Sequence, residues 1–347
     1  NWMAAAGVAG QDAALFDTVR AVGEELCPRL GISIPVGKDS LSMRTVWDDQ
    51  GSPREMISPV SLIVSGFAPV RDVRRTLTPL PETETPGPLW LVDLGEGLCR
   101  LGGSALTQVC GQTGDTPPDL VSPERLRSFF GVIQHLKWRG LLTAYHDRSD
   151  GGVIVSLLEM AFAGRCGLDI TLPDDAAPIP WLFNEELGAV IQVAPGSEDA
   201  VREAFAATGL DVHLHPVALL DPDGRIRIRQ GNRVVLESHR ATLQRQWQET
   251  SYQMQRLRDE PDCAREEWDR TEVDSPLRVD LGFDAGVDVA APYIATGQRP
   301  RVAILREQGV NGQVEMAAAF EHAGFTPVDV HMTDLLHGRH DLSAFKG

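Results

Sequence analysis

The densest group of chemically reactive side chains is the stretch HDRSDGG at residues 146–152, in which a histidine, two aspartates, an arginine and a serine precede two glycines. Apolar residues follow at helical spacing, so the pattern predicts a turn that leads into a helix N-terminus. The first N–H groups of a helix lack intrahelical partners and attract anions, and glycines let a phosphate approach them closely. A neighbouring carboxylate, here Asp147, can hold the divalent cation that accompanies a nucleotide.

This stretch has two interpretations. In the first, Ser149 or Asp150 caps an ordinary helix, and Asp147 and Arg148 are solvated. In the second, the loop binds a nucleotide through a set of residues at the start of the helix: Ser149, Asp150, Gly151 and Gly152. The stretch holds more polar groups than a cap requires, which favours the second interpretation.

A second polar cluster, Gly37, Lys38, Asp39 and Ser40, follows an apolar segment. A glycine permits a tight turn and the close approach of a ligand, so this cluster is a candidate ligand cleft. Lys38 can neutralise a phosphate, and Asp39 can bind a metal or orient a hydroxyl. A solvated β-turn explains the same residues equally well, and the G-x-x-x-x-G-K-[ST] pattern of a phosphate-binding loop is absent.

A third group, Asn184, Glu185 and Glu186, precedes an apolar run. In a strand, adjacent carboxylates point to opposite faces, so we expect at most one of them to reach a site near residues 146–152 and the other to face solvent. The histidines show no convincing metal-ligand spacing, and the H-G-R-H stretch at 337–340 is expected at the surface rather than in a zinc site.

Composition limits the partners of the chain. Its 347 residues contain 32 Lys and Arg and 49 Asp and Glu, a net charge of −17, which argues against a nucleic-acid or anionic-membrane surface and requires any phosphate site to be local. The five cysteines form no C-x-x-C pair and suit free thiols in a reducing cytoplasm. No apolar run approaches the roughly 20 residues of a membrane-spanning helix, and no targeting leader is visible. The abrupt start at Asn1 and end at Gly347 predict that the chain is part of a larger polypeptide.

Hydrophobic periodicity predicts several units in succession. The first holds an amphipathic helix at about 12–30 and a strand at 57–70, and it ends at a proline-rich linker, 74–88. In the second, strands and helices alternate, with the HDRSDGG loop directly after a strand at 141–147, so we expect an α/β or α+β sandwich with a mixed sheet. A polar helical connector begins near residue 240, and an incomplete α/β unit begins near residue 300.

Eight segments follow one another along the whole chain: NWMAAAG, GEELCPRLGISIPVGKDSLSM, AYHDRSDGG, EMAFAG, LFNEELGAVIQV, QMQRLRD, DVAAPYIATG and VAILREQGVNG. In this combination the chain resembles the large, single-chain phosphoribosylformylglycinamidine synthases, also called formylglycinamide ribonucleotide amidotransferases. The resemblance implies a synthase core that duplicates the fold of aminoimidazole ribonucleotide synthetase, followed by a class I glutaminase. It also implies an ATP-dependent ligase of purine biosynthesis, which converts formylglycinamide ribonucleotide, ATP and glutamine into formylglycinamidine ribonucleotide, ADP, phosphate and glutamate.

The resemblance also divides the chain. It implies that 1–76 is the later part of the second synthetase N-terminal-type half-domain, 77–240 its C-terminal-type domain, 241–298 a connector and 299–347 the start of the glutaminase. The remaining domains of the same polypeptide are then its partners, and the glutaminase Cys, His and Glu lie beyond this chain. We therefore expect no catalytic residue in the chain and no activity of the chain alone.

Two residues of the HDRSDGG loop carry over from the resemblance. Asp147 matches a Mg²⁺ ligand of the family's nucleotide site and Ser149 matches a nucleotide-contacting position, so Mg²⁺ and ATP or ADP are the expected cofactors. The resemblance does not decide whether this nucleotide site is catalytic or structural. Two alternatives remain: a stand-alone ATP-dependent kinase or synthetase of the same superfamily, and a non-catalytic nucleotide-binding scaffold.

Overall fold

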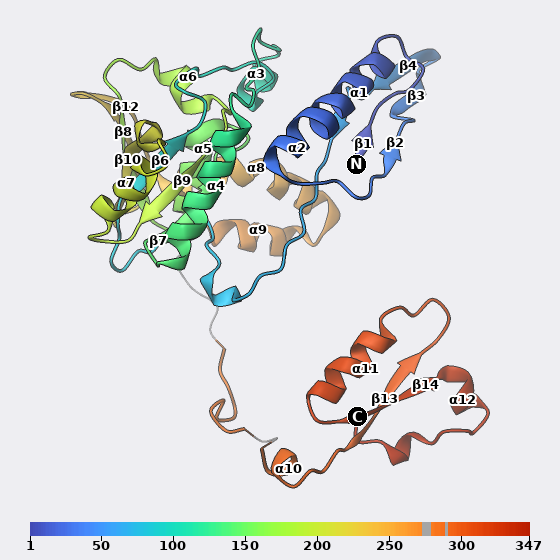
Figure 1. Cartoon of the computed structure of the whole chain (residues 1–347). Coiled ribbons are helices and arrows are strands. Elements are labelled where there is room, and N and C mark those ends of the chain that lie inside the picture. The colour runs from blue at the N-terminus through green and yellow to red at the C-terminus, as the bar shows by residue number, and fades with distance from the viewer. Residues whose placement is uncertain (273–278, 289–290) are drawn as a thin grey trace. The chain divides into compact units, whose positions relative to one another are not determined.

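A computed structural model describes residues 1–272, 279–288 and 291–347 and divides the chain into two compact units, Asn1–Ser275 and Pro276–Gly347 (Figure 1). Two short parts of the predicted connector, 273–278 and 289–290, lie outside the described residues. Within the described residues, no helix combines the length and the apolar composition that a bilayer crossing requires.

The first 72 residues contain the predicted amphipathic helix, which follows a two-residue strand. It consists of α1 (Gln11–Arg20), a π-helical segment (Ala21–Leu26) and α2 (Cys27–Leu30), and it ends at Gly31, whose φ of 73° is left-handed. Two small sheets accompany this helix. One has the strand order β2-β1-β5, and the other is a β-hairpin of β3 and β4. Their bounds are Trp2–Met3 (β1), Asp39–Ser40 (β2), Arg44–Asp49 (β3), Ser52–Ile57 (β4) and Ser61–Leu62 (β5).

The prediction of a strand over 57–70 is wrong for most of its length. Beyond the end of β4 at Ile57, only Ser61–Leu62 pairs with another strand. The partner strand β1 is two residues long, and Pro59 has no N–H to donate, so the apolar run has no edge along which to extend. Phe67 accordingly remains 95% exposed. Most of the segment 57–70 is therefore irregular, although its sequence is typical of a strand, because no partner strand is long enough to pair with it.

A mixed seven-stranded sheet forms the centre of the second part of this unit, as the sequence predicted. Its strand order is β12-β11-β8-β10-β6-β9-β7, with β8 and β11 parallel and the other neighbours antiparallel. The strands are Leu89–Asp93 (β6), Leu142–Asp147 (β7), Gly167–Leu172 (β8), Gly188–Val193 (β9), Leu214–Asp221 (β10), Arg225–Gln230 (β11) and Arg233–His239 (β12).

Helices cover both faces of this sheet, because alternate strand residues point to opposite faces. Leu89 and Leu91 belong to a core with α5 (Gly152–Gly164) and α6 (Pro178–Phe183), whereas Trp90 and Val92 belong to a core with α4 (Pro123–Trp138) and α7 (Glu198–Ala206). The short helix α3 (Ala105–Val109) lies between β6 and α4 in the chain. The HDRSDGG loop thus leaves the edge strand β7 and enters the buried helix α5.

The predicted connector is helical where it is described up to residue 272. Helix α8 (Arg240–Arg258) packs against α5, where the rings of Phe162 and Trp247 are 5.8 Å apart. Helix α9 (Pro261–Asp269) folds back on α8, and its Trp268 stacks on Tyr252 with ring centroids 4.4 Å apart.

The second unit has the predicted order of strand, helix and strand. Strands β13 (Arg301–Arg306) and β14 (Thr326–His331) are parallel, and α11 (Gln313–His322) connects them. Two short helices, α10 (Ala291–Ala295) and α12 (Met332–Leu336), flank this strand–helix–strand segment in the chain.

Candidate functional site

The HDRSDGG loop has the local structure that the sequence predicted. Asp147 is the last residue of β7, Gly151 precedes the first turn of α5 with φ of 84°, and Gly152 begins the helix with φ of 75°. A Cβ on Gly152 would lie 2.6 Å from the carbonyl oxygen of Leu182, so this position requires glycine for space as well as for its backbone conformation.

The carboxylate of Asp147 is oriented by a neighbour on the same face of β7. The hydroxyl of Tyr145 donates a hydrogen bond to Asp147 Oδ1 at 2.6 Å. Burial raises the pKa of Tyr145 well above its usual value, and the bond to Asp147 raises it further, so the hydroxyl remains a donor. Asp147 is exposed, and its second carboxylate oxygen has no hydrogen-bond partner among the described residues. This oxygen is free to bind a cation.

The histidine of the loop, His146, also contacts Asp147 and links it to α5. Its Nδ1 lies 2.7 Å from the carbonyl oxygen of Asp147, and its Nε2 lies 2.8 Å from Glu159 Oε2 on α5. His146 therefore ties the end of β7 to the second turn of α5, which limits the positions that the loop between them can adopt.

Ser149 and Asp150 are exposed, and their side chains make no hydrogen bond in the described part of the chain. Neither of them caps α5, because Gly151 occupies the cap position and no side-chain cap bond is present. The interpretation of this stretch as an ordinary side-chain cap is therefore wrong. The expectation of a solvated Arg148 is also wrong: this residue is 7% exposed and donates to Asp93 and to the carbonyl oxygens of Glu186 and Leu187.

The expectation that the N–H groups of this loop are open is wrong for three of them. Gly152 N–H donates to the carbonyl oxygen of Ser149 at 2.9 Å, and Arg148 N–H donates to the carbonyl oxygen of Gly188 at 2.9 Å. Gly151 N–H donates to Glu185 Oε1 at 2.8 Å. Acceptors within the chain therefore already bind these three N–H groups, which the sequence had suggested as phosphate-binding groups.

The prediction for the adjacent carboxylates is confirmed for one residue and wrong for the other. Glu185 reaches the loop, but Glu186 does not face solvent: it is 1% exposed and forms an ion pair with Arg100 at 2.7 Å. The rule of opposite faces does not apply, because these residues precede β9, which begins at Gly188. Asn184 is 2% exposed and donates to the carbonyl oxygens of Pro180 and Trp181.

Sequence reasoning missed Asp93, which stands at the end of β6. Its carboxylate accepts hydrogen bonds from Arg148 at 2.5 Å and from the N–H groups of Gly95 and Gly97 at 3.1 and 2.9 Å. Burial raises the pKa of Asp93, but Arg148 and the two N–H groups outweigh burial, so the pKa lies below its usual value. The sequence does contain a signal that could have drawn attention to Asp93: an aspartate at the end of a buried strand, with glycines two and four residues later.

Asp93 and Arg148 line a cavity of about 770 Å³. Polar side chains that also line this cavity are Glu96, Cys99, Arg125, Asp175, Asn184, His213 and His215. The side chain of Arg148 thus faces this cavity, while its neighbours Ser149 and Asp150 are exposed at the loop.

The cluster at residues 37–40 is separate from this loop. Its lysine, Lys38, donates to the carbonyl oxygen of Asp39 at 2.8 Å and to Ser40 Oγ at 3.1 Å, while Gly37 and Asp39 are exposed. Over the described ranges, no hydrogen bond or ion pair joins residues 37–40 to residues 146–152.

Mg²⁺ prefers oxygen ligands, and the free carboxylate oxygen of Asp147 and the hydroxyl of Ser149 suit it. In the part of the chain that the structure describes, no group of three or more His, Cys, Asp or Glu residues could hold a metal. The donor set therefore fits Mg²⁺ only if phosphate oxygens, water or further residues complete the coordination.

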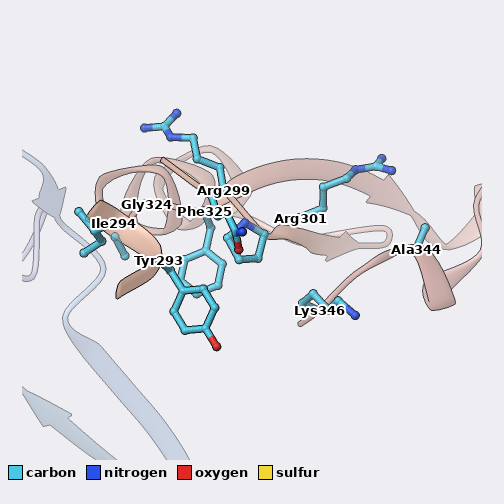
Figure 2. A pocket seen from close by; sticks show the side chains of 11 residues that line it. Tyr293, Ile294, Arg299, Arg301, Gly324, Phe325, Ala344 and Lys346 are labelled. Atoms are coloured by element: carbon cyan, nitrogen blue, oxygen red, sulfur yellow. The ribbon is translucent and has the colours of Figure 1, made fainter. Parts of the chain in front are cut away.

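The second unit contains a separate cavity of about 750 Å³, whose lining includes Tyr293, Phe325 and Lys346 (Figure 2). Figure 2 shows the guanidinium groups of Arg299 and Arg301 on the side of the ribbon away from the Tyr293 ring. Among the described residues that line this cavity, none is acidic.

Comparison with known proteins adds three family matches along the chain. Residues 1–69 match the FGAR-AT PurM_N-like domain, 90–224 the AIR synthase related protein, C-terminal domain, and 299–347 the CobB/CobQ-like glutamine amidotransferase domain. Together these matches define a chain in which two domains of the AIR synthase type precede a segment of a glutamine amidotransferase domain. In the identity and order of these domains the chain resembles the formylglycinamide ribonucleotide amidotransferases (FGAR-AT), as the sequence motifs predicted.

Solved structures with a similar fold share little sequence with the chain. "T. maritima PurL complexed with ATP" has 14% identity and a TM-score of 0.45 over 70% of this chain and 36% of that chain. "T. maritima PurL complexed with FGAR" has 12% identity and a TM-score of 0.46 over 70% and 38%. E. coli HypE, a hydrogenase maturation protein, has 16% identity and a TM-score of 0.43 over 69% and 70%. The chain thus spans about a third of the length of the PurL chains that it matches.

Proposed function

We propose that the chain contributes a Mg²⁺–nucleotide site to an FGAR amidotransferase of de novo purine biosynthesis, which converts formylglycinamide ribonucleotide with ATP and glutamine into formylglycinamidine ribonucleotide. The three domain matches, in this order, support this reaction. The observation that carries the site is the Asp147 carboxylate, one oxygen of which accepts a hydrogen bond from Tyr145. Its other oxygen and the side chains of Ser149 and Asp150 have no hydrogen-bond partner among residues 1–272, 279–288 and 291–347.

In this proposal Asp147 binds Mg²⁺, and Ser149 donates its hydroxyl to a phosphate oxygen. Asp150, Gly151 and Gly152 complete the nucleotide-binding loop. The two glycines let its backbone pack closely against Leu182 and Val155, so that Ser149 and Asp147 are held at the nucleotide. The bound Mg²⁺ would offset the negative charge of the polyphosphate. The loop's own residues orient the phosphate, because His146 and Tyr145 fix the position of Asp147.

The domain boundaries 1–76, 77–240, 241–298 and 299–347, and a cytoplasmic location, belong to the same proposal. We also propose that the chain alone neither hydrolyses glutamine nor makes product. A class I glutaminase uses a cysteine nucleophile, and the last cysteine of this sequence is Cys263, before the matched glutaminase segment.

Isothermal titration calorimetry with ADP and Mg²⁺ tests the site. We expect the unmodified chain to bind ADP with an affinity that rises with Mg²⁺ concentration, and Asp147→Ala to lose this Mg²⁺ dependence. Asp115→Ala is the matched control, because Asp115 is an exposed loop aspartate without a hydrogen-bonded side chain in the described structure. Equal binding by the unmodified chain and Asp147→Ala, or no heat with either, would remove the proposed site.

A further inference from the structure

One carboxylate oxygen connects two loops that are distant in the sequence. Glu185 Oε1 accepts hydrogen bonds from the N–H groups of Ala105 and Gly151, each at 2.8 Å. Ala105 is the first residue of α3, and Gly151 is the cap residue of α5. Glu185 therefore bridges the G-G-S turn before α3 and the proposed nucleotide loop before α5.

The charge of Glu185 makes this bridge strong. Hydrogen bonds from backbone N–H groups to a carboxylate are charge-assisted, and both donors lie at helix starts, where the backbone carries partial positive charge. Glu185 is only partly exposed, so water screens these bonds less than it would at an open surface.

The backbone on either side of Glu185 is anchored in the core. Asn184 is bonded to α6, Glu186 is paired with Arg100, and the Arg148 guanidinium donates to the carbonyl oxygen of Glu186. Glu185 is therefore a fixed point, and the two loops are the parts that would move if its carboxylate were removed.

We propose that Glu185 is a positioning residue for the nucleotide loop, an inference that rests on the proposed nucleotide site. Its carboxylate, and not a phosphate, accepts the hydrogen bond from the Gly151 N–H. This bond fixes the loop and thereby the positions of Asp147 and Ser149, which bind the ligand. Phosphate contacts then come from Ser149 and from the Mg²⁺ on Asp147, not from the Gly151 N–H. In the contrasting role, phosphate displaces Glu185 from the Gly151 N–H when the nucleotide binds. Removal of the carboxylate would then strengthen nucleotide binding, whereas the positioning role predicts that it weakens binding.

Two measurements on the same chain test the proposal: amide hydrogen exchange at Ala105 and Gly151, and the dissociation constant for Mg²⁺·ADP. In Glu185→Ala we expect exchange at both amides to accelerate by at least about tenfold and nucleotide binding to weaken by about 10–100-fold, the range typical for loss of a supporting contact. Glu185→Gln keeps an acceptor oxygen, so it should restore most of both properties.

Glu203→Ala, which removes an exposed glutamate of α7, is the control and should change neither measurement. Unchanged exchange at Ala105 and Gly151 in Glu185→Ala would overturn the bridge. Tighter nucleotide binding by Glu185→Ala would overturn the positioning role of Glu185. It would show instead that a phosphate displaces Glu185 from the Gly151 N–H. If the unmodified chain binds no nucleotide, the proposed function fails, whereas the exchange rates still show whether Glu185 holds the two loops.

Discussion

The hydroxyl of Tyr145 lies 2.6 Å from Oδ1 of Asp147, two residues further along β7. The two side chains share a face of the strand because side chains alternate along it. The hydrogen bond leaves the other carboxylate oxygen of Asp147 free, and this pairing of a held and a free oxygen is the geometry expected of a metal ligand with a supporting neighbour.

Removal of the Tyr145 hydroxyl tests this support. Tyr145→Phe should weaken Mg²⁺-dependent ADP binding by about tenfold, because the Asp147 carboxylate loses the bond that orients it. Titration of Mg²⁺ at constant ADP measures the effect. Tyr252→Phe, at a tyrosine stacked on Trp268, should leave the titration unchanged, and an equal loss in both variants would argue against a specific role for Tyr145.

The buried pair of Asp93 and Arg148 should stabilise the sheet unit. Asp93→Asn should lower the free energy of unfolding by about 3 kcal/mol, because it leaves the buried Arg148 guanidinium without its charge partner. Urea unfolding at pH 7 gives this value. Asp115→Asn, at an exposed position, should change the free energy of unfolding by less than about 0.5 kcal/mol.

The same pair sets a pH dependence. The pKa of Asp93 is lower in the folded chain than its usual value, so its contribution to stability is fully present above the unfolded pKa, near 4, and is lost as pH falls through the folded pKa. The unmodified chain should therefore lose stability below about pH 4 more steeply than Asp93→Asn. Parallel acid-unfolding curves for the two proteins would contradict this assignment.

Glycine at position 152 is required by both conformation and space. Gly152→Ala should destabilise the chain by about 3 kcal/mol, since alanine is strained at φ of 75° and its Cβ would collide with the carbonyl oxygens of Leu182 and Asn184. Gly140→Ala is the comparison, because Gly140 has φ of 68° and nothing within 4 Å of its added Cβ. Thermal unfolding should show a loss of only about 1 kcal/mol for Gly140→Ala, and equal losses would exclude the collision.

The cysteines should differ in reactivity. Cys110 is exposed, whereas Cys27 and Cys166 are buried, and burial raises the pKa of the Cys166 thiol to about 11. With iodoacetamide at pH 8, Cys110 should react first, and Cys166 should react only after unfolding. Peptide mass spectrometry identifies the labelled sites, and rapid labelling of Cys166 in the folded chain would contradict the burial of this residue.

Helical periodicity was a dependable guide to the local structure. The run of apolar residues after Gly152 predicted α5 correctly, because helical spacing depends only on residues three and four positions apart, and most of this helix is buried. The strand expected at 57–70 failed because a strand needs a partner, and β1 offers only two residues for pairing. The hydrophobic pattern of residues 57–70 does not show how long a neighbouring strand will be available for pairing.

The sequence by itself determined that acids, a hydroxyl and two glycines stand where a strand turns into a buried helix, since these features depend on neighbours a few residues apart. Only the tertiary structure decided which groups meet there. Glu185 reaches Gly151 and Asp93 reaches Arg148 across separations of 34 and 55 residues, because the sheet places β6 and β7 on either side of β9. Such contacts follow from strand order and packing, which no short stretch of sequence specifies.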